Sequence, residues 1–260
     1  MNRLAVVVVL GACGGGGGAA IDAPSVAIDA RVVDGKPSDA PHAFPLARTH
    51  TLYVAIDGVT VTPGSGPDSV SEDAVANTTM IATAPAALGP WLAGDPDRAA
   101  KVGILVDQIQ SVIAPYNITV VTTQPATGPY EMVVVTDDPA TKLASSLQLI
   151  SAISASACSR QASGIGFVFP TALSDVGTRR TDFVQYQAIE MMGLANGVPL
   201  SSVAGDCMCG SNSDTHCQDM LDSLCTIGGA HTPLAGTTIC DDFDATMDEA
   251  AVFLAVFGPH

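Results

Sequence analysis

The sequence predicts an α/β domain: a small twisted mixed sheet packed against two long helices, followed by a disulfide-rich, irregular C-terminal part. Three observations predict it. Short apolar runs rich in β-branched residues alternate with two long stretches of helically spaced apolar residues, and cysteines crowd the last third of the chain. Hydrophobic residues make up 47% of the 260 residues, and aromatic residues only 5%. A full-size core can therefore be buried, built mainly from Ala, Val, Ile and Leu.

The first half of the domain begins with a strand at 52–56, followed by a loop rich in Gly, Pro and Ser that continues through Pro67. The first long helix opens near Asp95, because Asp95 can cap it and Pro96 suits the first turn. Pro115 ends this helix. Its apolar residues recur at helical spacing: Val102, Leu105, Val106, Ile109 and Val112 or Ile113.

The second half of the domain shows the same two patterns. Apolar runs rich in β-branched and aromatic residues predict three strands, at 118–122, 132–136 and 165–169. Helical spacing predicts a weak helix at 140–154, a second long helix at 181–194 that stops at Asn196-Gly197, and a last helix at 248–257.

The first thirteen residues predict export and lipid attachment. Arg3 gives a positive start, residues 4–10 are uninterruptedly apolar, and Leu10-Gly11-Ala12-Cys13 resembles the lipobox of bacterial lipoproteins. That resemblance implies a signal peptide at 1–12 and a lipid-modified Cys13, which would attach the chain to a membrane. The residue directly after the cysteine, Gly14, is similar to the residue found at that position in lipoproteins sorted to the outer membrane. The apolar run is too short for a permanent membrane span, which needs about 20 residues.

Residues 13–48 predict a flexible tether that leads to a globular domain at 49–260. Five glycines follow Cys13 directly, and the rest of the segment is rich in Gly, Ala, Pro and Asp. Such a composition cannot bury enough apolar surface to offset the entropy of ordering.

The charge balance argues against nucleic acid as a partner. The formal net charge is −16, and such a protein is repelled by phosphate backbones. No Lys or Arg follows Arg180, whereas residues 181–260 carry eleven Asp and Glu. A solvated acidic surface is the favoured interpretation, and a calcium-binding region is the alternative, because Ca²⁺ prefers clustered oxygen ligands.

The cysteines predict a disulfide framework. Cys13 is assigned to the lipid, which leaves an even number for an exported domain: Cys158, Cys207, Cys209, Cys217, Cys225 and Cys240. Three disulfides with fifteen possible connectivities follow, and the stretch 206–240 should be rich in loops. The alternative is a metal site at Cys207-Met208-Cys209 and His216-Cys217, but free thiols at zinc spacing belong to reducing compartments.

Residues 51 to about 210 resemble the metzincin clan of zinc metallopeptidases, in the version attached to bacterial lipoproteins. The order of elements matches, and residues 52–59 look like the first strand of that family. Gly193-Leu194 sits where the family turns sharply after its zinc-binding helix, and Cys207-Met208-Cys209 sits where the family has its Met-containing turn. The resemblance implies a five-stranded twisted sheet with an antiparallel edge strand above the second long helix.

The zinc-binding motif of that family is degenerate here. The family pattern is H-E-x-x-H-x-x-G-x-x-H, in which three His bind zinc and the Glu activates a water molecule. Anchored on Gly193, this chain has Tyr186, Gln187, Glu190 and Asn196 at the four chemical positions. A phenol and an amide are poor zinc ligands, and Gln187 cannot accept a proton from water. We therefore expect neither zinc nor hydrolysis by this mechanism.

The remaining histidines do not replace the lost ligands. His42, His50, His216, His231 and His260 are scattered, and none lies one helical turn from another. Tyr186 and Glu190 share a helix face, so with Asn196 they could line an oxygen-rich metal pocket. The favoured interpretation is that these side chains hydrogen-bond among themselves and fill the former cleft, because hard cations usually need several carboxylates.

Three hypotheses about function follow. The first is a catalytically inactive metzincin-like domain on the cell envelope, with a binding or structural role and a peptide or another envelope protein as partner. The second is an active zinc metallopeptidase with non-standard ligands. The third is an unrelated envelope lipoprotein domain.

Overall fold

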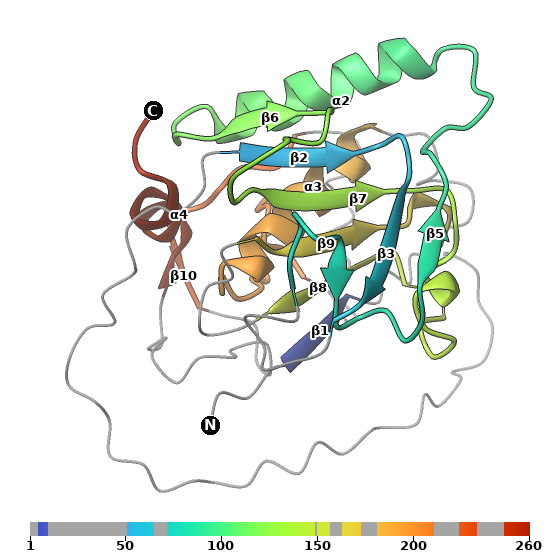
Figure 1. Cartoon of the computed structure of the whole chain (residues 1–260). Helices are drawn as coiled ribbons and strands as arrows, with labels where there is room; N and C mark the ends of the chain where they lie inside the picture. Colours follow the sequence, from blue (N-terminus) through green and yellow to red (C-terminus); the bar gives the residue numbers. More distant parts are fainter. Residues whose placement is uncertain are drawn as a thin grey trace, which may run out of the picture.

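The computed structural model describes residues 51–64, 72–148, 150–156, 163–172, 181–210, 224–232 and 247–260, together with the backbone of 5–9. Within these residues the chain forms the expected α/β fold, with one mixed sheet and two long helices (Figure 1). No helix in the described part is both long and apolar enough to cross a bilayer.

The main sheet has six strands in the order β1-β8-β9-β7-β2-β6. Their bounds are β1 Ala5–Val9, β2 Thr51–Ala55, β6 Thr119–Val121, β7 Glu131–Val135, β8 Ala152–Ser156 and β9 Ile165–Val168. The four strands β6, β2, β7 and β9 are mutually parallel. β8 runs antiparallel to β9, and β1 runs antiparallel to β8 at the edge.

Each central strand buries both of its faces, and alternate residues enter different cores. On β2, Leu52 and Val54 face the helical side, whereas Tyr53 and Ala55 face the opposite side. This two-sided burial explains why these strands read as continuous apolar runs.

Helices cover one face of the sheet and a small second sheet covers the other (Figure 1). The helices are α2 Arg98–Ile113, α3 Thr181–Ala195 and α4 Glu249–Phe257. The second sheet has the order β4-β3-β5, with β3 Val59–Pro63, β4 Thr78–Thr79 and β5 Ala86–Leu88. Two 3-10 turns, η1 Ala140–Lys142 and η2 Pro170–Ala172, and a short ladder of β10 Ala230–His231 with β11 Met247–Asp248 complete the described elements.

Most of the sequence-based elements are confirmed. The strands expected at 52–56, 118–122, 132–136 and 165–169 correspond to β2, β6, β7 and β9, and the helices expected at 181–194 and 248–257 correspond to α3 and α4. The first long helix begins three residues after Asp95. Asp95 does not cap it; its carboxylate accepts a hydrogen bond from the Asp97 backbone N–H at 2.9 Å instead.

Two expectations about local structure are wrong. The loop expected through Pro67 contains β3, which pairs with β5 as an antiparallel strand. The weak helix expected at 140–154 is only the single turn η1 followed by β8. Ala152 faces one core and Ile153 and Ala155 face the other, and residues 152–154 pair with β9, so tertiary pairing overrides a weak helical pattern.

Candidate functional site

Helix α3 carries the degenerate motif and packs directly beneath β8 and β9. Its approach to the sheet is close: a Cβ added to Gly166 on β9 would lie 2.5 Å from the Cβ of Met191. Only glycine allows the helix backbone to come this near to the strand. The motif side chains are thus held between the sheet and the C-terminal part of the chain.

The resemblance aligns Tyr186 with the first family histidine; in the structure the Tyr186 side chain is buried. Its hydroxyl donates a hydrogen bond to the backbone carbonyl of Cys209. The loop that contains Cys209 is pinned in turn, because Ser201 N–H donates to the Met208 carbonyl at 2.7 Å. Tyr186 therefore fastens α3 to the 201–210 loop.

Gln187 and Glu190 form a short polar chain inside the domain. Ser151 Oγ donates to Gln187 Oε1 at 3.3 Å, and Gln187 Nε2 donates to Glu190 Oε2 at 2.5 Å. Both side chains are almost completely buried. The other carboxyl oxygen of Glu190 accepts no hydrogen bond from any of the described residues. The partner of Glu190 is thus Gln187, which was not among the three side chains expected to hydrogen-bond with one another, Tyr186, Glu190 and Asn196.

Asn196 stands at the position of the third family histidine and turns toward the sheet. Its Nδ2 donates to Glu131 Oε1 at 2.6 Å and to the Met192 carbonyl at 2.8 Å. Glu131 is the first residue of β7 and is buried. Asn196 thus links the end of α3 to the start of the central strand.

The chain turns at Gly197, four residues after Gly193, where the resemblance to the family implies the turn. Gly193 lies inside α3, where Met208 approaches so closely that an added Cβ would lie 2.3 Å from its sulfur. The helix ends with Gly197 at φ +77°, and Val198 N–H donates to the Gly193 carbonyl at 3.0 Å. This is the Schellman arrangement, which confirms the helix end expected at Asn196-Gly197.

Burial controls the charge of this site. Desolvation raises the pKa of Glu131 to about 8, although the hydrogen bond from Asn196 opposes the shift. Desolvation also raises the pKa of Glu190 well above its usual range, against the opposing bond from Gln187. The raised pKa of Glu131 favours its protonated form at pH 7, and burial shifts Glu190 in the same direction; a protonated carboxyl is a poor ligand for a cation.

A disulfide and a glutamine hold the C-terminal part against α3. Cys207 is bonded to Cys225, and Gln185 Nε2 donates to the Cys225 sulfur at 3.0 Å. Cys209 is disulfide-bonded as well, so the alternative of a metal site at Cys207 and Cys209 is wrong. Cys13, Cys158, Cys217 and Cys240 lie outside the described residues, as do His42, His50 and His216.

A pair of buried carboxyls, Asp206 and Glu249, joins the 201–210 loop to α4. Burial raises the pKa of Glu249, and the neighbouring carboxyl of Asp206, to which it is hydrogen-bonded, raises it further. The amide of Met208 donates to Asp206 Oδ1 at 2.7 Å. The acidic residues Asp241, Asp242 and Asp244, which contributed to the calcium alternative, lie outside the described part. Among the described side chains, no group of three or more His, Cys, Asp or Glu is arranged to hold a metal ion.

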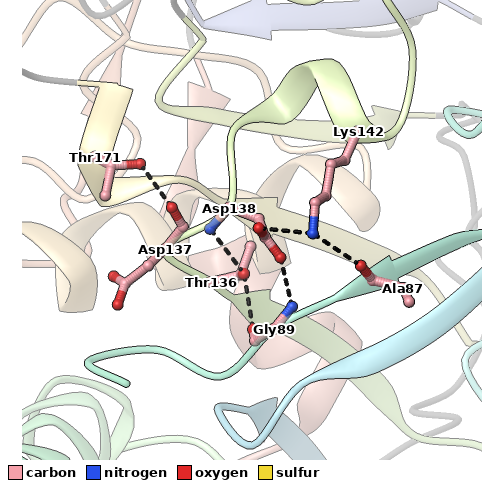
Figure 2. A network of polar contacts seen from close by, with 7 residues as sticks. All are labelled: Ala87, Gly89, Thr136, Asp137, Asp138, Lys142 and Thr171. Atoms are coloured by element: carbon pink, nitrogen blue, oxygen red, sulfur yellow. Dashed lines mark hydrogen bonds and ion pairs between the residues drawn. The ribbon is translucent and has the colours of Figure 1, made fainter. Parts of the chain in front are cut away.

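The carboxyl ends of the parallel strands carry a separate polar network (Figure 2). Asp138 accepts from the Gly89 amide at 2.6 Å and pairs with Lys142 at 2.7 Å, and Thr136 Oγ1 donates to the Gly89 carbonyl at 2.8 Å. In Figure 2 the carboxylate of Asp137 points away from this network. These bonds tie β7 to the segment after β5.

Beside this network lies a hollow of about 450 Å³ at the start of α2. Its charged lining residues are Asp95, Asp97, Lys101 and Asp137, and Lys101 pairs with Asp95 at 2.7 Å. The lining has an excess of negative charge, which favours a small cation over an anion.

Sequence reasoning missed the partners of the motif side chains. Glu131 borders an apolar run, so a charged residue next to a buried strand was the available signal. Ser151 and Gln185 offered no signal, because a polar residue between apolar ones is equally common on a surface.

No protein-family model matches the chain, and the searches of curated proteins and of solved structures find no significant match.

Proposed function

We propose that this chain is an exported, lipid-anchored envelope protein whose metzincin-like domain is catalytically inactive and has a binding or structural role. The proposal rests on the hydrogen bonds that the motif side chains make. Tyr186, Gln187 and Asn196 all donate hydrogen bonds to protein acceptors in a buried environment. Such side chains hold a fold together and do not present ligands to a metal or a base to water.

The topology supports the metzincin-like part of the proposal. Without β1, which covers β8 as the sixth strand, the strands β6, β2, β7, β9 and β8 would form a five-stranded mixed sheet with its antiparallel strand at the edge, and α3 packs against β8 and β9. This is the arrangement implied by the resemblance. It disfavours the hypothesis of an unrelated domain, and the buried motif positions disfavour an active peptidase.

We propose that binding takes place along the edge of β8. In the whole chain that edge is covered by β1, which pairs with it over five residues from Ala5↔Ser156 to Val9↔Ala152. The lipobox predicts that residues 1–12 are removed, which would leave β8 as an open edge. An open edge accepts an extended peptide as an additional strand.

A strand-shaped peptide is therefore expected to bind the processed protein. The chain is expressed in a bacterial envelope and purified, and its N-terminus is identified by mass spectrometry. A labelled peptide that contains Ala-Val-Val-Val-Val between lysines should bind saturably in a fluorescence anisotropy titration. A control peptide with proline at the central position should bind at least tenfold more weakly, because proline lacks the N–H needed for the strand ladder. Equal binding of both peptides, or no binding to processed chains that are monomeric, would contradict the proposal.

A further inference from the structure

We propose that the strand which covers β8 in the processed protein is β8 of a second copy of this chain, so that two domains form a two-fold dimer with one continuous sheet. This inference rests on the removal of residues 1–12 under the proposed function, and it names the partner of the edge described there.

The composition of β8 carries the first step. Its residues are Ala152, Ile153, Ser154, Ala155 and Ser156. Exposed edge strands are normally protected from pairing by a charged residue, a proline or a bulge. β8 has no charge and no proline, and its pairing with β1 is continuous over all five residues. A strand of this kind belongs in the interior of a sheet.

The register of β1 carries the second step. β1 places Val6 opposite Ala155, Val7 opposite Ser154 and Val8 opposite Ile153. An antiparallel β8 of a second copy, centred on Ser154, uses the same backbone groups. It places Ile153 of one copy opposite Ala155 of the other, and the reverse. Apolar side chains thus face apolar side chains, and the two Ser154 residues meet at the two-fold axis.

The anchor and the charge carry the third step. Two copies held by a flexible tether in one membrane surface meet at a high effective concentration, which favours the pairing further. The net charge of −16 on each chain opposes the contact. Salt screens that repulsion over a Debye length of about 8 Å at physiological ionic strength, so the dimer should gain stability as salt is raised.

A cysteine placed on the two-fold axis tests the register. Ser154→Cys is introduced into the full chain, which is expressed in a bacterial envelope, oxidised and analysed by non-reducing electrophoresis. The matched control is Ala152→Cys on the same strand. In the proposed register, the two copies of residue 152 lie four residues apart along the strands, or about 14 Å, too far for a disulfide. The disulfide-linked dimer fraction should be at least tenfold higher for Ser154→Cys.

The unmodified protein supplies a second measurement that does not depend on how the variants fold. Light scattering should give the mass of a dimer for the processed chain, and the Ala-Val-Val-Val-Val peptide should convert it to a monomer. Equal crosslinking of both cysteine variants, or a processed chain that stays monomeric at high concentration and high salt, would overturn the dimer. Saturable peptide binding by such a monomer would leave the proposed function intact.

Discussion

Raising the pH from 5 to 9 is expected to destabilise the domain by roughly 4 kcal/mol through Glu131 alone. Burial raises the pKa of this carboxyl to about 8 in the folded protein, from an ordinary value of 4.5. A group with a raised folded pKa contributes stability that is fully present below the unfolded pKa and is lost as the pH rises through the folded pKa. Because a whole domain is stable by about 5–15 kcal/mol, the effect should dominate its alkaline unfolding.

Three further glutamates act in the same direction, the first of them Glu249, whose pKa burial raises to about 10. Desolvation raises the pKa of Glu72 to about 7, and that of Glu190 well above its usual range. We expect the domain to be most stable in mild acid, measured as the urea midpoint at a series of pH values. Glu131→Gln keeps an acceptor for Asn196 and carries no charge, so it should flatten the profile between pH 6 and 9. Asp107→Asn, on the exposed side of α2, is the control and should leave the slope unchanged. A Glu131→Gln profile as steep as that of the native chain would refute this explanation.

Removal of the Cys207–Cys225 disulfide is expected to lower the free energy of unfolding by about 3 kcal/mol. The bond closes a loop in the unfolded chain and so reduces the entropy of that state. The two cysteines are separated by 18 residues. Gln185 contacts Cys225 through both its amide nitrogen and its carbonyl oxygen, so the bond also fixes the loop on α3.

The double variant Cys207→Ala/Cys225→Ala should therefore lower the melting temperature by roughly 6–12 °C for a domain of this size. Differential scanning calorimetry measures the shift. Ser202→Ala, at an exposed position in the same loop, is the matched control and should melt within about 2 °C of the native chain, because exposed substitutions cost little. A double variant that melts at the native temperature would show that other contacts hold this loop.

The sequence predicted those elements whose burial is complete or strongly periodic. β2 and β7 bury both faces and read as unbroken apolar runs, and α2 repeats Leu105, Ile109 and Ile113 on its buried side. β8 was missed because its Ala residues favour a helix by intrinsic propensity, and only its pairing with β9 makes this segment a strand.

The sequence alone shows which zinc ligands the motif lacks, but it does not predict which residues the motif side chains contact. The absence of histidines at the three zinc-binding positions implied by the resemblance is visible in the sequence itself, because zinc chemistry needs specific residues at fixed spacing. The hydrogen bonds of these side chains join residues far apart in the chain, such as Asn196 and Glu131. They depend on the way β7 passes the end of α3. Pairings of this length follow from the tertiary fold and not from local pattern.

The metal content of the processed full chain tests most directly the claim that α3 carries a closed polar core and no metal centre. The protein is purified from the envelope, dialysed against trace zinc and calcium, and analysed by plasma mass spectrometry. We expect near-zero zinc per chain, because Tyr186, Gln187 and Asn196 donate hydrogen bonds to protein acceptors and burial raises the pKa of Glu190, which favours its uncharged form. About one tightly held zinc per chain that is lost in Glu190→Gln would contradict the account.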